Sequence, residues 1–237
     1  MNKPSKESLE LFNQDIALIL SKERLRGYEN NLEKHDENLA LAMEVGKRIS
    51  ILEIYLRNKL DYCLKQMIGE EWIKSEKSLS LITLKSHKSI DELTPPQILS
   101  TLMLGEVVEL IRAYEIESVM FDLRKIKFKK YHWSNREFFF TPKSKMPFSN
   151  LDKNIIVFNL LRTIRNRAFH WENLLKIREI KGSIFPRITT VYPNEDSKQN
   201  QTRIGVMPEM ILCFLDDLIN TINNEEISKN TRKTLGI

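Results

Sequence analysis

One long stretch of helical periodicity constrains the fold of this chain more than any other feature. It begins at Asp36, a residue type that often caps the start of a helix, and it ends at Gly69, a residue type that often stops one. Apolar residues recur through it at steps of three and four, with one wider gap, as on the core-facing side of an amphipathic helix. The segment therefore predicts a helix of about nine turns. The predicted buried stripe consists of Leu39, Met43, Ile49, Leu52, Leu56, Leu60, Leu64 and Met67.

Glycine and proline are scarce in the rest of the chain, which favours long helices with few connections. Only seven glycines and eight prolines occur among 237 residues. Further helices are predicted to start near Ser5 and near Ser21, and to cover 95–117 with Thr94 as the cap, 151–177 with Asn150 as the cap, and 208–224. Between prolines near 183–205, isoleucine, threonine, valine and tyrosine predict a small β or loop segment. We therefore expect a mainly α protein forming a single domain over 1–237.

Charge and cysteine content indicate the cellular setting. The chain has 37 lysines and arginines against 32 aspartates and glutamates, a net charge of +5, which suits a polyanionic partner without requiring one. Cys63 and Cys213 form no CxxC pair, and no secretory leader is recognisable, so we expect a cytoplasmic protein. No apolar run approaches the roughly 18 residues that cross a bilayer, so we expect no membrane span.

The segment 121–150 mixes lysines and arginines with phenylalanine, tyrosine and tryptophan. Such a mixture can bind a nucleic-acid backbone and stack on its bases. Alternatively, the aromatic rings pack between helices while the lysines stay in water. We expect the second arrangement.

Several enzyme classes are excluded by missing motifs. The chain has no GxxxxGK[ST] loop, no GxGxxG, no HExxH and no GxSxG. The four histidines lie far apart in the sequence, outside the spacing of metal ligands. We therefore expect chemistry that needs no metal and no cofactor.

The segment "IRNRAFH" contains the residues best suited to such chemistry. Arg162, Asn166 and His170 follow one another at four-residue intervals and would share one face of an ideal helix. Arg165 lies about 100° around the helix from Asn166, so a substrate that wraps the ridge could contact both Arg165 and His170. In the alternative, Arg165 pairs with a carboxylate and His170 packs between helices. An i, i+4 pair of Glu53 and Arg57 could brace the helix that carries the motif.

Four segments together resemble the Abi-like (abortive infection) family of the HEPN superfamily: "LEIYLRNKLDYCL", Trp72, "LMLGEVVELI" and "LRTIRNRAFH". The hallmark of that superfamily of helical proteins is an arginine followed by a histidine after four to six residues, often with a polar residue directly after the arginine. The likeness covers about 21–175 and implies a helical bundle of HEPN type, with 176–237 packed onto it. One departure is visible, because Ala168 is followed by Phe169 where the family has a small residue before the histidine.

The resemblance implies a metal-independent endoribonuclease that acts as a toxin or antiphage effector. Arg165, Asn166 and His170 would be catalytic, and Arg162, Arg167, Glu53 and Arg57 would bind RNA or support the site. RNA carries its own nucleophile in the 2′-hydroxyl, so cleavage needs a base, an acid and positive charge on the phosphorane. Histidine gains and loses a proton near neutral pH, arginine is a forked phosphate donor, and Asn166 can orient either the phosphate or the imidazole.

In-line displacement places the attacking and leaving oxygens on opposite sides of phosphorus, whereas one chain supplies a single motif histidine. We therefore expect a homodimer with a shared cleft that binds single-stranded or loop RNA. A neutralising antitoxin or other regulatory protein is a further possible partner. The alternative function is a non-catalytic helical module that binds RNA, a nucleotide or a protein, and a purely structural interaction protein is a third.

Overall fold

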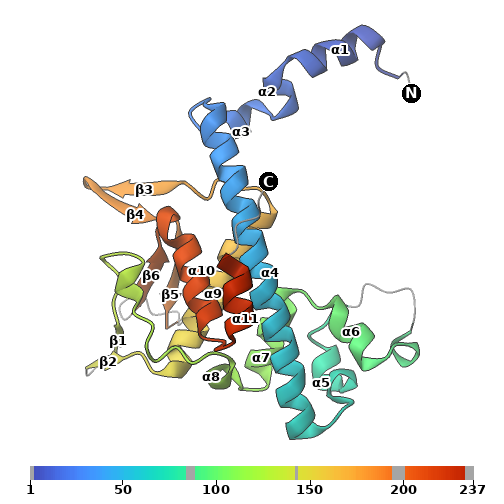
Figure 1. Ribbon diagram of the computed structural model, residues 1–237, viewed down its shortest axis with the longest axis vertical. Coiled ribbons are helices and arrows are strands. Elements are labelled where there is room, and N and C mark those ends of the chain that lie inside the picture. The colour runs from blue at the N-terminus through green and yellow to red at the C-terminus, as the bar shows by residue number, and fades with distance from the viewer. Residues whose placement is uncertain (1–2, 84–88, 142–143, 194–200, 233–237) are drawn as a thin grey trace.

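The computed structural model describes residues 3–83, 89–141, 144–193 and 201–232. Helices dominate, as predicted. The longest is α4 (Leu32–Ile68), which runs through almost the whole height of the body in Figure 1. Among the described residues, no helix combines the length and the apolarity needed to cross a bilayer.

The predicted long helix is present, but it begins earlier than predicted. Asn31 caps α4 by accepting the Lys34 N–H at 3.1 Å, so Asp36 lies within the helix and is not its cap. Two residues of the predicted stripe were wrong, because the side chains of Met43 and Met67 are about half exposed. Buried positions at three- and four-residue steps define the face that meets the core: Ala42, Val45, Ile49, Leu52, Leu56, Leu60 and Leu64.

The other elements have the following bounds. The α-helices are α1 (Lys6–Gln14), α2 (Ile16–Ile19), α3 (Lys22–Arg26), α5 (Glu76–Leu79), α6 (Pro95–Thr101), α7 (Leu104–Ala113), α8 (Glu117–Met120), α9 (Asn150–Phe169), α10 (Ile211–Asn220) and α11 (Glu225–Arg232). Short 3₁₀ helices are η1 (Trp72–Lys74), η2 (Ile90–Glu92), η3 (Phe128–Lys130) and η5 (Pro208–Met210). The strands are β1 (Phe138–Phe140), β2 (Lys145–Pro147), β3 (Ile177–Ile180), β4 (Ser183–Pro186), β5 (Ile188–Tyr192) and β6 (Thr202–Val206).

The prediction of one helix over 95–117 was wrong, because the chain is extended at Leu102 and Met103 between α6 and α7. Two carboxylates stabilise this break. Glu106 accepts the N–H of Met103 at 2.9 Å, and Glu53 accepts the N–H of Leu104 at 3.1 Å. These contacts satisfy donors at the start of a new helix, so α7 begins where the sequence pattern alone suggests continuation.

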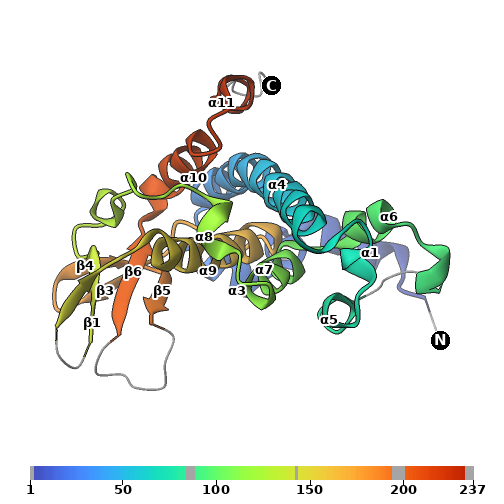
Figure 2. The same cartoon turned by 90° about the horizontal axis from the view of Figure 1, so that it is seen from below.

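The described strands form three antiparallel hairpins, β1–β2, β3–β4 and β5–β6. The last two account for the predicted β or loop segment near 183–205, although residues 194–200 of that segment lie outside the described part. β1–β2 was not predicted. Figure 2 shows the hairpins gathered at one end of the molecule, with α5 and α6 at the other. Ile188, Ile204 and Val206 from β5 and β6 join the same buried cluster as α4, α9 and α10.

The basic and aromatic segment 121–150 packs as expected. Phe121, Phe128, Tyr131 and Phe148 are buried, while the lysines between 125 and 130 are exposed. Phe138, Phe139 and Phe140 are partly exposed, and the Trp133 side chain is 66% exposed. Half of the phenylalanine, tyrosine and tryptophan rings of this segment are therefore buried in the core.

Asn135 and Gly205 join this segment to β6. The buried Asn135 amide donates to the carbonyls of Phe128 and Gly205 at 2.8 and 2.7 Å and accepts the Gly205 N–H at 2.8 Å. Gly205 has no room for a side chain, because a Cβ there would collide with the ring of Pro186 and lie 3.0 Å from the methyl carbon of Thr189. The close approach of β4, β5 and β6 depends on this glycine.

Replacing Gly205 with alanine should therefore destabilise the protein, and replacing Gly46 with alanine should stabilise it. Overpacking at Gly205 should lower the free energy of unfolding by about 1–3 kcal/mol. Gly46 lies inside α4 with open space around its Cβ position, so Gly46→Ala should raise that free energy by about 0.5–1 kcal/mol through helix propensity. Urea unfolding of both variants measures the two changes, and changes of equal sign would contradict this account.

Candidate active site

The helix that carries the motif, α9, begins with a capping box. The Ser149 hydroxyl accepts the Asp152 N–H at 3.2 Å, and the Asp152 carboxylate accepts the Ser149 N–H at 2.7 Å. Asn150, the predicted cap, is instead the first helical residue. Its amide donates to the carbonyls of Ser118 and Phe121 at 2.7 and 2.9 Å, which fastens α9 to the end of α8.

α9 ends just before His170, and not near 177 as predicted. His170 is the C-terminal cap residue, and Trp171 follows it with a positive φ of 55°. The Trp171 N–H donates to the Ala168 carbonyl at 3.1 Å, and the Glu172 N–H donates to the Arg167 carbonyl at 2.8 Å. This pattern is a Schellman motif, in which a left-handed residue turns the chain away from the helix axis. The motif histidine therefore lies at the exposed end of the helix.

The chain that follows His170 is held by α3 and α4. Asn38, which is fully buried in α4, donates to the Glu172 carbonyl at 3.2 Å and accepts the Leu174 N–H at 2.7 Å. Arg24 of α3 donates to the Trp171 carbonyl at 2.8 Å. These bonds fix the backbone on both sides of the turn and thereby the place from which His170 projects.

Arg165 is half-buried on the surface of α9, and its guanidinium lies against an aromatic ring. Its Cζ is 4.9 Å from the centroid of Phe169, and its Nη1 makes a long 3.5 Å contact with Asn166 Oδ1. The Nε is buried and has no hydrogen-bond partner among the described residues. Over the same residues no carboxylate forms an ion pair with Arg165, so the alternative in which a carboxylate neutralises it is not observed.

His170 and Asn166 are both exposed, and their backbones are joined by a hydrogen bond from the His170 N–H to the Asn166 carbonyl at 3.0 Å. His170 is therefore not the buried interhelical residue of the alternative interpretation. The predicted trio of Arg165, Asn166 and His170 lies within the last two turns of one helix, open to solvent.

The other two predicted arginines of α9 have carboxylate partners. Arg162 contacts Glu109 of α7 at 3.5 Å, and Arg167 forms a 2.9 Å pair with Glu172. Burial lowers the pKa of Arg167, and the positive charges of Arg187 and Arg178 lower it further against the opposing effect of Glu172. Arg167 therefore faces a strongly positive neighbourhood.

The pair of Glu53 and Arg57 forms, with 3.7 Å between Oε1 and Nη2. Its placement differs from the expectation, because the Glu53 carboxylate accepts the backbone N–H of Leu104 at the start of α7. The pair thus supports α7 directly, and the described residues show no hydrogen bond from it to α9.

Sequence reasoning missed the residues that surround Arg167. A shallow depression of about 400 Å³ is lined by Arg167, Lys176, Ile177, Arg178 and Arg187. The alternation of Lys176 and Arg178 with apolar residues is a usable signal, because alternate residues of a strand share one face. Arg187 could be placed beside them only from the pairing of β3 with β4.

Within the described residues, no group of three or more histidines, cysteines, aspartates or glutamates lies close enough together to hold a metal ion. No protein-family model, curated protein or solved structure matches this chain. A functional assignment therefore rests on the side chains of the site.

Proposed function

We propose that this chain is a metal-independent endoribonuclease of the Abi-like branch of the HEPN superfamily, with Arg165, Asn166 and His170 in its active site. The observation that carries the proposal is the state of Arg165. Its guanidinium lies on a surface helix without a carboxylate partner in the described part of the chain, five residues before the exposed His170. An arginine left in this condition can donate to an incoming phosphate without first breaking an ion pair.

The chemistry needs only groups that RNA and these residues supply. The 2′-hydroxyl oxygen attacks the neighbouring phosphorus while the bond to the 5′-oxygen breaks, giving a 2′,3′-cyclic phosphate and a 5′-hydroxyl. The attacking hydroxyl loses a proton and the leaving oxygen gains one, and His170 can perform either transfer. Arg165, whose guanidinium lies over the ring of Phe169, would donate to the phosphate oxygens as negative charge develops on them.

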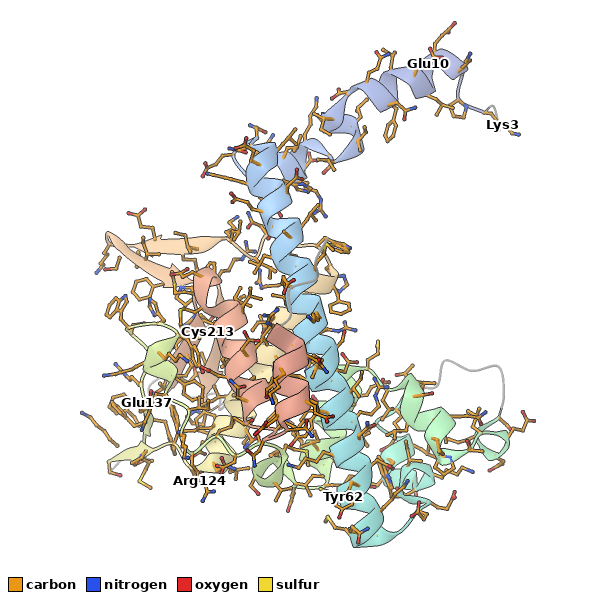
Figure 3. The ribbon with its side chains drawn as sticks, viewed as in Figure 1. Lys3, Glu10, Tyr62, Arg124, Glu137 and Cys213 are labelled. Carbon is orange, nitrogen blue, oxygen red and sulfur yellow. The ribbon has the colours of Figure 1, made fainter. Side chains whose placement is uncertain are left out.

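A second histidine for the other proton transfer would come from a homodimer. The N-terminal arm, α1 and α2, supports this proposal because it contains no buried residue. It extends beyond the upper end of α4, well away from the body that holds Glu137 and Cys213 (Figures 1 and 3). Contiguous exposed apolar side chains of this kind mark interaction surfaces. The exposed residues are Leu9, Leu11, Phe12, Ile16, Leu18 and Ile19.

The proposed reaction predicts RNA cleavage that continues in EDTA. His170→Ala should lower the cleavage rate by about 10²–10⁴-fold, the usual effect of removing an acid or base. Arg165→Ala should lower it by about 10²–10³-fold, the usual effect of removing a donor to the transition state. Gel analysis of a defined single-stranded RNA with purified protein measures all three results.

Arg124→Ala is the matched control for these variants. Arg124 is an exposed arginine paired with Asp122 at 2.7 Å, and its carbonyl contacts Lys153 near the start of α9. It lies far from the motif at the other end of that helix, so its loss should leave cleavage unchanged. Cleavage that survives in His170→Ala, or that stops in EDTA, would contradict the proposal. Binding of RNA without cleavage by the parent protein would favour the non-catalytic binding module.

The proposed dimer predicts that charge in the N-terminal arm releases monomers. Leu11→Asp combined with Phe12→Asp should reduce the mass in light scattering from twice 28.0 kDa to 28.0 kDa, because carboxylates cannot enter an apolar interface without a large desolvation cost. Val119→Asp changes another exposed apolar residue, on α8, and should leave the mass unchanged. A monomeric parent protein would contradict the proposed dimer.

The proposed role as a toxin or antiphage effector predicts growth arrest on expression. Bacteria that express the parent chain should stop dividing, and His170→Ala should restore growth, because a ribonuclease free in the cytoplasm degrades cellular RNA. Growth curves with equal protein levels, checked by immunoblot, test this expectation. If the parent chain and His170→Ala arrest growth equally, toxicity does not depend on the proposed chemistry, and the proposed role is contradicted.

A further inference from the structure

A second positively charged region lies beside α9, across the β3–β4 hairpin. The shallow depression next to Arg167 is continued by a deeper one of about 500 Å³, and Arg178 lines both. The deeper depression lies between the segment 132–136 and the hairpins β3–β4 and β5–β6. Among the residues that the structure describes, no aspartate or glutamate lines either depression. We call the cations that line them the basic surface: Arg136, Arg167, Lys176, Arg178, Arg187 and Arg203.

Arg178 is the centre of the basic surface and is held in place by its neighbours. Its Nη2 donates to the Pro186 carbonyl at 3.2 Å and to the Thr189 hydroxyl at 3.0 Å. Its Nε is buried and has no hydrogen-bond partner among the described residues. A buried donor without a partner costs free energy.

Arg167 shows the same condition from the side of α9. Its Nε is also buried without a partner in the described part of the chain, although Glu172 pairs with its Nη1. Burial is the main cause of the lowered pKa of Arg167; Glu172 opposes the shift, and Arg187 and Arg178 add to it. Arg167 therefore lies within electrostatic reach of two further cations of the basic surface.

Aromatic rings form one wall of the deeper depression. Phe185 lines it and packs against His132 and Trp133, with ring centroids 5.6 and 5.9 Å away. His132 is buried, and its ring is fixed between the Ser134 hydroxyl at 2.7 Å and the Ile184 carbonyl at 3.1 Å. Both ring nitrogens of His132 thus have hydrogen-bond partners. We assign His132 a structural role, in which its ring supports Phe185.

An aromatic face beside unpaired arginines matches the two parts of a nucleotide. Bases stack on aromatic rings and on guanidinium planes, and phosphates accept forked hydrogen bonds from arginine. A depression of about 500 Å³ also falls within the usual size of small-molecule sites. A nucleic-acid strand could occupy both depressions. Each of its nucleotides carries a phosphate, and cations lie on either side of Arg178 to bind successive phosphates.

We infer that the basic surface binds a single-stranded RNA segment, with a base against Phe185 and successive phosphates along Arg203, Arg178 and Arg167. The inference deepens the proposed function, because such a strand would lead from the hairpins to α9. It concerns binding alone, so it can hold or fail independently of cleavage.

Fluorescence anisotropy with a labelled, short single-stranded oligoribonucleotide tests the inference. The parent for this experiment is the full chain with His170→Ala, so that cleavage cannot alter the probe. Arg178→Gln combined with Arg203→Gln should weaken binding by about tenfold or more, because hydrogen bonds to charged groups are lost. It should also flatten the salt dependence of binding, since fewer counterions are released.

Phe185→Leu is the second variant, because leucine keeps the apolar packing and removes the ring. It should weaken binding by about tenfold, the usual loss for one stacked base. Near-identical thermal unfolding of the variants and the parent establishes that each protein is folded. If the arginine variant unfolds early, Phe185→Leu still decides the question.

The matched control is Arg26→Gln combined with Arg124→Gln, which removes the same charge from exposed positions that line neither depression. Arg124 lies at the lower edge of the body, whereas the β3–β4 hairpin lies at its upper left (Figures 1 and 3). This control should change the affinity by less than about twofold, since distant surface charges are screened. An equal loss in control and test variants would overturn the assignment.

Two competitors identify the ligand. Adenosine monophosphate should displace the oligoribonucleotide only weakly, because it offers a single phosphate. If it binds as tightly as the strand, the site is one for a free nucleotide and the RNA assignment fails. Equal displacement by polyglutamate would mean that any polyanion binds, which would also overturn it. If the chain with His170 intact binds RNA but never cleaves it, the proposed function alone is refuted.

Discussion

Burial of one face of α4 is the contact on which the rest of the structure depends. Isolated helices are marginal in water, so α4 is stable because α7, α9 and α10 cover its apolar side. Polar residues interrupt that face at two useful places. Asn38 binds the backbone after His170, and the buried Arg48 donates to Asp216 of α10 at 2.7 Å. The helix that organises the core therefore also sets the position of the motif.

Both candidate sites contain arginines whose Nε is buried without a hydrogen-bond partner among the described residues, Arg165 in one and Arg167 and Arg178 in the other. Cations and anions are nearly balanced over the chain, at 37 against 32, so the net charge of +5 says little about any one place. Arg162 and Arg167 have carboxylate partners, whereas Arg165 has none over the described residues. A guanidinium with a buried, unsatisfied Nε is costly to keep.

Phe169 and its neighbour Ala168 have separate structural roles at the end of α9. Ala168 is buried against the core. Phe169 then points outward and supports the guanidinium of Arg165 at 4.9 Å. Ala168 therefore packs on the inner side of the helix, and the Phe169 ring contacts Arg165 on the outer side.

Sequence periodicity predicted the helices around α4, α9 and α10 and the small β segment near 183–205. It also identified some helix ends, because Ser5, Ser21 and Thr94 cap helix starts and Gly69 caps the end of α4. Other ends and the break between α6 and α7 were predicted wrongly. Asp36 and Asn150 were plausible caps, yet Asn31 and Ser149 perform that role. The break before α7 depends partly on Glu53, which lies 51 positions earlier in the chain. Such a contact has no local sequence signal.

The sequence by itself determined three things: the spacing of Arg165, Asn166 and His170, the helical periods, and the overall charge. The first two depend on residues close together in the chain, and the third is a sum over all residues. Which arginines remain without a carboxylate, and which converge on Arg178, was decided by the tertiary structure alone. The physical reason is that charge neutralisation depends on distance in space. The β3–β4 pairing and the packing of α9 set those distances between residues that the sequence keeps apart.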